Sequence, residues 1–233
     1  AHVVVTAATL VLLHPLPLDG SIWAREISSL TPRSIAPTLY AYGDTLDAWA
    51  VSVIEEAGDG PLVVVGNSVG GSCALDVVRL DPGRVQLLVL VGTKAAHRPE
   101  PRVRDEALEL LARDGIAAAW DRYWAPLFAA DADPTVVAAA RSVALRQTVD
   151  DLAVGVRAFH GRPDRSDLAR SIDVPTLVVC GEHDPLSATA PAFAGGLRRG
   201  RCRIVEGAGH YVPVERPAEL AALIAAELDS VAW

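Results

Sequence analysis

The sequence lacks the features of proteins that bind nucleic acid or span a membrane. Lysine and arginine number 21 against 29 aspartates and glutamates, for a formal net charge of −8, and no basic run stands out. Since binding to nucleic acid depends on clustered positive charge, we expect no nucleic-acid partner. No apolar stretch reaches the roughly 20 residues that a transmembrane helix needs, so we expect no membrane partner.

Cysteine is scarce as well. The three cysteines, Cys73, Cys180 and Cys202, are far apart in the chain, and no Cys-x-x-Cys or His/Cys cluster indicates a metal site. We therefore expect no metal and no disulfide framework, and the reducing cytoplasm is the expected compartment. An incidental bridge between Cys180 and Cys202 stays open, because both can lie on neighbouring strands.

The segment Val3–Leu18 is apolar, yet it lacks the pattern of a secretory signal. It has no basic start, and His14, Pro15 and Pro17 interrupt it. It is also too short to span a bilayer. We interpret this segment as part of a sheet.

The chain does contain the material for a large core, since 51% of its 233 residues are hydrophobic and 21% are charged. Short apolar runs alternate with longer segments of helical period, which is typical of a parallel sheet covered by helices. We expect strands at Thr9–Leu13, Pro61–Val65, Val85–Val91 and Thr176–Cys180, with weaker candidates at Ile35–Tyr40 and Arg203–Val205. We expect helices at Ser21–Leu30, Thr45–Glu56 and Ser72–Leu80, and a last one from Arg216 or Pro217.

One long segment interrupts this alternation. About eighty residues between the strands at Val85–Val91 and Thr176–Cys180 contain no convincing strand, far more than a crossover helix requires. We expect an α/β core made of residues 1–94 and 171–233, with residues 95–170 inserted as a helical cap. Helices are expected in it near Arg102–Asp114, Ile116–Phe128, Thr135–Arg146 and Asp150–Phe159.

The most informative motif is Gly66-Asn67-Ser68-Val69-Gly70, which follows an apolar strand and precedes a helix. A serine on a sharp strand-to-helix turn needs small neighbours, and the following helix offers N–H groups to a developing oxyanion. We therefore expect Ser68 to be a nucleophile. The alternative is a glycine-rich turn whose serine has no chemical role.

A serine nucleophile needs a base, and the base needs a carboxylate that orients it. Among the six histidines, His210 lies in a glycine-rich loop after a predicted strand and before the final helix, and it is the expected base. Asp184 directly follows the turn after the strand at Thr176–Cys180 and is the expected acid. Glu182 in the same turn is the alternative.

The chain order of serine, aspartate and histidine is that of α/β-hydrolase enzymes. The stretch Gly66-Asn67-Ser68-Val69-Gly70-Gly71 resembles the nucleophile turns of small esterases and enol-lactonases and, more distantly, of meta-cleavage-product hydrolases. This resemblance implies an α/β-hydrolase fold, with a mostly parallel central sheet flanked by helices and an inserted helical cap. It also implies a hydrolase that requires no cofactor. Because the N-terminal part is short, we expect one or two early strands of the family's usual eight to be missing or abbreviated.

The implied reaction is acyl transfer through an acyl-enzyme on Ser68. The expected substrate and partner is a small, largely apolar carboxylic ester or lactone. Three other reactions at the same residues stay open: C–C bond hydrolysis, perhydrolysis and cyanohydrin cleavage. A ligand-binding protein on the same scaffold is a further alternative. The oligomeric state and the pathway stay open.

The resemblance also suggests where the oxyanion binds. One donor is the N–H of Val69, the residue after the nucleophile. The other is expected in the segment His14-Pro15-Leu16-Pro17, which resembles the family's loop after an early strand. Because proline has no N–H, only Leu16 can donate between the two prolines. The alternative is that the prolines merely end the strand.

Aromatic residues make up only 5% of the chain, yet several gather in the expected cap. They are expected to form an apolar roof over the substrate, although a cap that packs on itself is an equal alternative. The candidate substrate-binding residues are Trp120, Tyr123, Trp124, Phe128 and Phe159. Three arginines of the expected cap are alternative anchors for a substrate carboxylate, although we interpret them as solvated helix charges: Arg141, Arg146 and Arg157.

Overall fold

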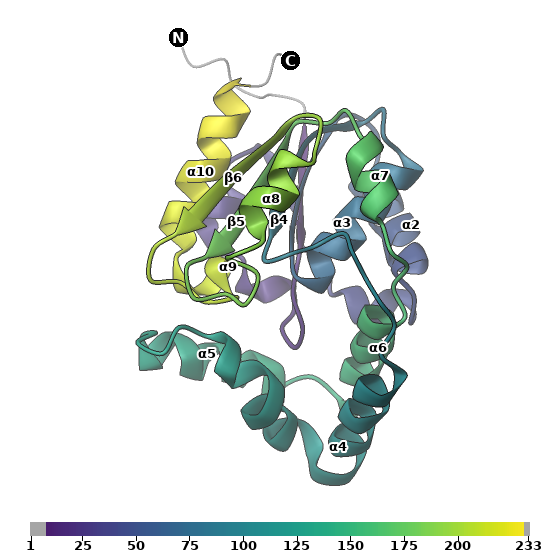
Figure 1. Ribbon diagram of the computed structural model, residues 1–233, viewed down its shortest axis with the longest axis vertical. Helices are drawn as coiled ribbons and strands as arrows, with labels where there is room; N and C mark the ends of the chain where they lie inside the picture. The colour runs from purple at the N-terminus through teal and green to yellow at the C-terminus, as the bar shows by residue number, and fades with distance from the viewer. Residues whose placement is uncertain (1–7, 231–233) are drawn as a thin grey trace.

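The computed structural model describes residues 8–230, and Figure 1 shows an α/β core with a group of helices beside it. The expectation that Val3–Leu18 belongs to a sheet can therefore be compared with the structure only from residue 8 onward, and residues 3–7 lie outside the described residues. The described residues contain six strands in one sheet, in the order β2-β1-β3-β4-β5-β6. All neighbouring strands pair in parallel, which confirms the expected sheet.

The central strands lie where the apolar runs predict them. They are β1 (Thr9–Leu13), β3 (Leu62–Asn67), β4 (Val85–Val91) and β5 (Thr176–Gly181). The edge strand β6 (Gly200–Val205) begins three residues before its expected start. The strand expected at Ile35–Tyr40 is wrong: β2 is Arg33–Ile35, and Leu39–Tyr42 forms a 3-10 helix. Pro37 between them has no N–H for a strand ladder.

Helices cover both faces of the sheet. One face carries α2 (Leu46–Ala57), α3 (Val69–Leu80), α7 (Ser166–Ser171) and α8 (Ala190–Gly195), and the other carries α1 (Arg25–Ser28) and α10 (Pro217–Ser230). The single helix expected at Ser21–Leu30 is wrong, since a 3-10 turn (Gly20–Ile22) precedes a short α1. Helix α3 begins at Val69 instead of Ser72, so it follows Ser68 directly.

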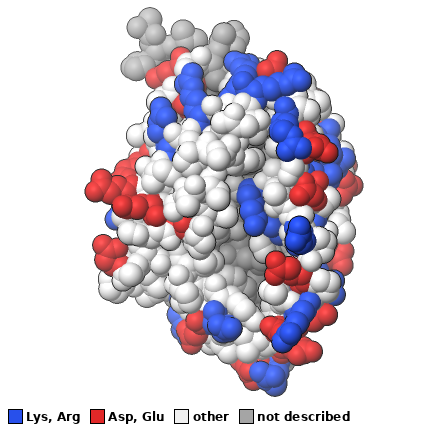
Figure 2. All heavy atoms as spheres, viewed as in Figure 1, with Lys and Arg blue, Asp and Glu red and all other residues white. Residues whose placement is uncertain are grey.

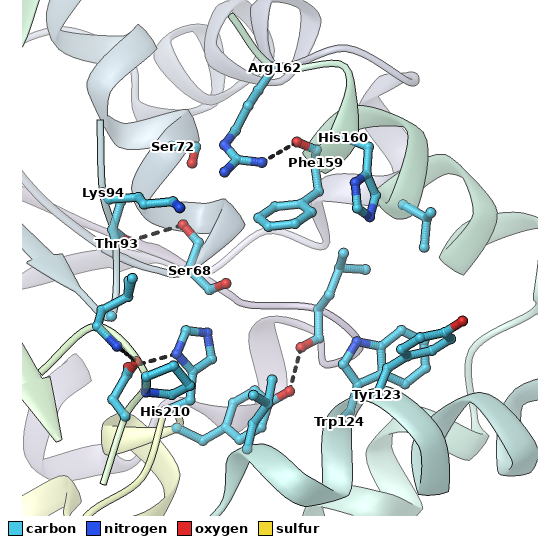
Figure 3. A pocket seen from close by; sticks show the side chains of 18 of the residues that line it. Ser68, Ser72, Thr93, Lys94, Tyr123, Trp124, Phe159, His160, Arg162 and His210 are labelled. Carbon is cyan, nitrogen blue, oxygen red and sulfur yellow. Dashed lines mark hydrogen bonds and ion pairs between the residues drawn. The ribbon is translucent and has the colours of Figure 1, made fainter. Parts of the chain in front are cut away.

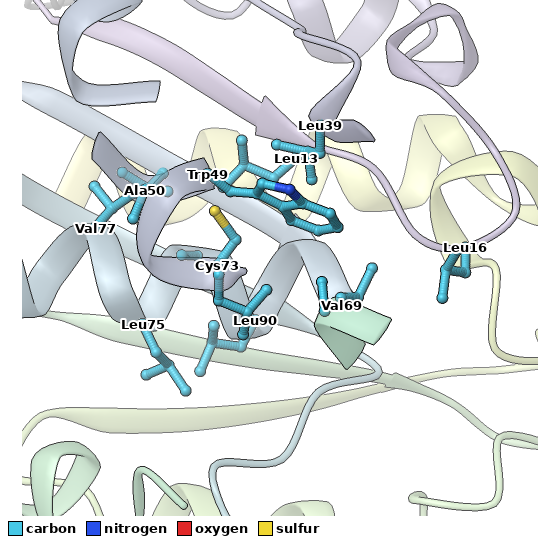
Figure 4. Close-up of a cluster of buried hydrophobic side chains, with 14 of the residues drawn as sticks. Leu13, Leu16, Leu39, Trp49, Ala50, Val69, Cys73, Leu75, Val77 and Leu90 are labelled. Carbon is cyan, nitrogen blue, oxygen red and sulfur yellow. The ribbon is translucent and has the colours of Figure 1, made fainter. Parts of the chain in front are cut away.

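The core fixes α3 against the sheet. Alternate residues of β3 point to opposite faces, so that Val64 packs in the cluster under α2 and α3 while Val63 packs in the cluster under α1 and α10. Figure 4 shows Trp49 of α2 beside Cys73 of α3, and both side chains are fully buried. Burial of a large apolar side chain contributes roughly 1.5–3 kcal/mol to stability. The packing of α3 against α2 and the sheet therefore fixes the position of the turn that precedes α3.

The long segment between β4 and β5 is helical. It contains α4 (Pro101–Ala119), a π-helical turn (Trp120–Trp124), a 3-10 turn (Ala125–Leu127), α5 (Pro134–Leu145) and α6 (Val149–His160). The two helices expected at Arg102–Asp114 and Ile116–Phe128 correspond to α4 and the two turns after it, and Gly115 with φ of 80° marks a kink at the expected break. Figure 1 shows α4, α5 and α6 together beyond the carboxyl ends of the strands, whereas α7 lies against the core.

Three further features bear on the sequence expectations. Among residues 8–230, no helix is long and apolar enough to cross a membrane. The described part of the chain holds no group of three or more His, Cys, Asp or Glu side chains suited to a metal ion. Cys73, Cys180 and Cys202 are free thiols, so the bridge that stayed open is not formed.

Candidate active site

The carboxyl ends of the strands bring Ser68, Asp184 and His210 to one cavity. Ser68 follows β3, Asp184 follows β5 and His210 follows β6. The cavity has a volume of about 380 Å³, and its walls come from both the core and residues 95–170. Figure 2 shows a hollow on this face, between the core and the helices below it. Figure 3 shows that Ser68 and His210 face the same space.

Ser68 occupies a strained turn. Its φ is 56° and its ψ is −118°, and it is the only non-glycine residue with positive φ in the described part of the chain. Such a conformation persists only where its surroundings hold it. The Ser68 N–H donates to the Val91 carbonyl at 2.9 Å, and the Thr93 hydroxyl donates to the Ser68 carbonyl at 3.1 Å. A Cβ on Gly70 would lie 2.2 Å from the Leu13 carbonyl oxygen, so the turn requires glycine there.

His210 and Asp184 form a buried pair. The His210 Nδ1 and the Asp184 Oδ2 are 2.7 Å apart, and the Asp184 Oδ1 accepts the Leu186 N–H at 2.8 Å. Burial alone would raise the pKa of Asp184, but the hydrogen bond and charge of His210 and the Leu186 N–H outweigh it and hold that pKa below its usual value. An ionised carboxylate can only accept, so Nδ1 carries the hydrogen and Nε2 is free to accept a proton.

Glu182, the alternative acid, has a different role in the structure. Its side chain is about half exposed, and its carboxylate accepts the Gly207 N–H at 2.9 Å. The neighbouring His183 N–H donates to the Ala208 carbonyl at 2.9 Å. The turn after β5 is thus tied to the loop that carries His210, and Asp184 is the carboxylate of this turn that contacts the histidine.

Glu215, which sequence reasoning missed, fixes the His210 loop. It lies at the end of α9 (Val212–Glu215) and is 7% exposed. Its carboxylate accepts the N–H groups of Gly209 at 3.0 Å, Ala129 at 3.1 Å and Tyr211 at 3.3 Å. Since Ala129 belongs to the helical segment between β4 and β5, one buried carboxylate holds the histidine loop and this segment together. A lone acid in the apolar run after His210 was the available signal.

The loop after β1 is fixed from two sides. The Tyr211 hydroxyl donates to the Leu16 carbonyl at 3.0 Å, and the Tyr40 hydroxyl donates to the Leu18 carbonyl at 2.7 Å. Leu16 lines the cavity. Within residues 8–230, the backbone N–H groups of Leu16 and Val69 donate to no protein acceptor. Neither N–H is therefore used in a hydrogen bond among these residues.

His14 supports this loop in its neutral form. Its ring is fully buried, with Nδ1 3.1 Å from the Pro15 carbonyl oxygen and Nε2 accepting the Leu39 N–H at 2.9 Å. Burial lowers the pKa of His14 to about 4, although the Pro15 carbonyl and Asp19 act in the opposite direction. A neutral ring can donate through one nitrogen and accept through the other, which matches both contacts.

We expect His14 to weaken the fold at acid pH. The unfolded residue takes up a proton near pH 6.5, while the folded one stays neutral down to about pH 4, so stability falls as pH is lowered through this window. Urea unfolding at a series of pH values should show that His14→Gln removes about 2 kcal/mol of the stability change between pH 7 and 4.5. The exposed His183 is a matched control, and His183→Gln should leave the profile unchanged. Equal profiles for wild type and His14→Gln would contradict a neutral His14.

The aromatic candidates divide into two groups. Tyr123, Trp124 and Phe159 line the cavity. Trp120 and Phe128 are absent from the described residues that line it and pack behind it instead, with ring centroids 5.8 Å apart. The three cap arginines considered from the sequence are likewise absent from this lining. Besides His210, three basic residues line the cavity that are not among the candidates from the sequence: Lys94, His160 and Arg162.

Known proteins share this architecture. Residues 10–223 match the family described as "Alpha/beta hydrolase family". An esterase from Thermogutta terrifontis, solved with malate bound, is 26% identical with a TM-score of 0.87, over 97% of this chain and 91% of that one. The enol-lactonase from Burkholderia xenovorans LB400 is 23% identical with a TM-score of 0.82, over 96% and 92% of the two chains.

A pimeloyl-[acyl-carrier protein] methyl ester esterase from Aromatoleum aromaticum is 39% identical over 105 residues, which are 39% of this chain and 40% of that protein. The chain spans 66% and 40% of the length of two curated relatives that it matches, from Bacillus subtilis and Aromatoleum aromaticum. The family match covers most of the chain and agrees with the parallel sheet and its flanking helices. The chain therefore belongs to the alpha/beta hydrolase family.

Proposed function

We propose that this protein is a serine hydrolase that cleaves a carboxylic ester or lactone of a small, largely apolar substrate. One observation carries the proposal: His210 Nδ1 lies 2.7 Å from Asp184 Oδ2, in the same cavity that Ser68 lines from its left-handed turn. The family relatives include esterases and an enol-lactonase, which supports this class of substrate.

The proposed reaction has two steps. The Ser68 Oγ attacks the carbonyl carbon while His210 Nε2 takes the hydroxyl proton, and the ionised Asp184 stabilises the imidazolium. When the tetrahedral intermediate collapses, His210 gives this proton to the leaving alcohol and the acyl group stays on Ser68. A water molecule, deprotonated by His210, then releases the carboxylic acid and restores the serine.

The oxyanion is proposed to bind between the N–H groups of Leu16 and Val69. Both donors are unused by the described residues, and Val69 is the first residue of α3, where the helix dipole also favours negative charge. The Tyr211 hydroxyl donates a hydrogen bond to the Leu16 carbonyl and so fixes the loop that carries the Leu16 N–H. Donors that are fixed in advance stabilise the developing charge at little reorganisation cost.

Residues 95–170 are proposed to act as a cap that selects the substrate. They supply Tyr123, Trp124 and Phe159 to the cavity wall, and none of the three reacting residues. The wall is mainly apolar, which suits an acyl chain or a small ring. The three free thiols favour a reducing compartment such as the cytoplasm.

The proposal is tested by steady-state hydrolysis of p-nitrophenyl esters from acetate to octanoate and of small lactones. We expect measurable turnover of several members, with an optimum at an acyl length that the cavity accommodates. Hydrogen peroxide added as a co-substrate tests for perhydrolysis, and a cyanohydrin offered as the substrate tests for cyanohydrin cleavage. A folded protein that cleaves no ester and no lactone would contradict the proposal and favour a ligand-binding role.

A further inference from the structure

Arg162 is a buried cation in the cavity wall. The residue is 7% exposed and lines the cavity. Its guanidinium carbon lies 4.0 Å from the centroid of the Phe159 ring, and its Nη1 donates to the Phe159 carbonyl at 2.5 Å. Its buried Nε has no hydrogen-bond partner in the described part of the chain. These contacts hold the side chain in place but leave its charge without a counterion.

A nearby arginine, Arg165, differs from Arg162 because it is paired with a carboxylate. Arg165 lies three residues further on, and its Nη2 is 2.6 Å from the Oδ1 of Asp76, which is fully buried. Arg79 contacts the same carboxylate at 2.9 Å. Arg162 has no such carboxylate within residues 8–230, and burial lowers its pKa to about 10, so that it still carries its charge at neutral pH. An unpaired buried charge is costly unless a ligand neutralises it.

The surroundings of Arg162 favour a negatively charged group. Lys94 also lines the cavity, and in Figure 3 its side chain extends toward the guanidinium of Arg162. Of the described residues that line the cavity, Asp184 is the only acid, and it is paired with His210. In the view of Figure 3, Ser68 lies between His210 and the end of the cavity that holds Arg162. An ester held over Ser68 can therefore extend toward the two cations.

We propose that Arg162, assisted by Lys94, binds a carboxylate of the substrate while Ser68 attacks the ester or lactone carbonyl. This inference rests on the proposed function and narrows its substrate class to a small apolar ester or lactone with one carboxylate. The planar guanidinium matches a carboxylate in shape and hydrogen-bond geometry. Hydrolysis of such a substrate yields a dicarboxylate or a hydroxy acid with a second carboxylate.

The test compares two esters of equal chain length, p-nitrophenyl pentanoate and the mono-p-nitrophenyl ester of glutaric acid. We expect wild type to prefer the charged ester, with kcat/KM higher by about tenfold or more. Arg162→Gln should lower kcat/KM for the glutarate ester by about 10- to 100-fold and for the pentanoate ester by less than about threefold. Arg162→Lys keeps the charge but loses the planar guanidinium, so its kcat/KM for the glutarate ester should lie between those of wild type and Arg162→Gln. Arg157→Gln, at an exposed site on α6, is the matched control and should change neither value.

A second readout does not depend on activity. Glutarate should raise the Tm of wild type and of Ser68→Ala, but not that of Arg162→Gln, and neutral pentane-1,5-diol should shift none of them. Glutarate binding through Arg162 without any ester cleavage would contradict the proposed function and leave the carboxylate site standing. Cleavage of both esters in the same ratio by wild type and Arg162→Gln would overturn the carboxylate site alone. If Arg162→Gln does not fold, a wild-type protein that shows no preference for the charged ester overturns the carboxylate site.

Discussion

Ser68→Ala is expected to lower kcat/KM for any ester substrate by about four orders of magnitude or more, with the fold unchanged. The reason is that the Ser68 Oγ forms the bond to the acyl group, and no other group in the turn can replace it. The backbone strain is already present, since both serine and alanine carry a Cβ at φ of 56°. Steady-state kinetics with a p-nitrophenyl ester and a thermal melt check the two parts of this expectation.

Ser72 offers a matched control for this variant. It lies one turn further along α3 and also lines the cavity. Ser72→Ala should keep activity to within about tenfold, because Ser72 is not placed to receive help from His210. Near wild-type hydrolysis by Ser68→Ala, or an equal loss for both variants, would mean that Ser68 is not the nucleophile.

Asp184→Asn is expected to cost about 10³- to 10⁴-fold in kcat, whereas Glu182→Gln should cost less than about tenfold. The amide of the new side chain can donate to His210 Nδ1 and so favour the tautomer whose Nε2 cannot accept the serine proton. The amide oxygen can still accept the Leu186 N–H, so the change tests charge and tautomer more than packing. Glu182 contacts the Gly207 N–H and is a carboxylate of the same turn, which makes it the natural control. The reverse ranking of the two variants would assign the acid to Glu182.

Much of the core could be predicted because it depends on short-range patterns. Strands buried on both faces are typically near-continuous apolar runs rich in Val and Leu, and β3, β4 and β5 have this character. The turn at Ser68 needs small residues at fixed offsets, since a Cβ on Gly66 would lie 2.3 Å from the Gly70 carbonyl oxygen. Local chemistry of this kind is visible in a single sequence.

The missed residues depend on contacts between distant segments. Glu215 matters because its buried carboxylate accepts the Ala129 N–H, and Arg162 matters because it lines the cavity while its buried Nε has no hydrogen-bond partner within residues 8–230. No spacing in the chain distinguishes Arg162 from Arg165, which is paired with Asp76. Trp120 and Trp124 lie in one helical stretch of the sequence, but of these two tryptophans in the π-helical turn only Trp124 lines the cavity, beside Tyr123.

The most direct test of Ser68 as the nucleophile is peptide mapping by mass spectrometry after reaction with a p-nitrophenyl phosphonate. The phosphonate mimics the ester. When the serine oxygen attacks phosphorus, p-nitrophenolate departs and a stable phosphonyl group stays on that oxygen. The proposed mechanism predicts one phosphonyl group per chain, on the peptide that contains Ser68, formed in parallel with the loss of esterase activity. Complete loss of activity with Ser68 unmodified would contradict it, and so would full esterase activity in a protein whose Ser68 is fully modified.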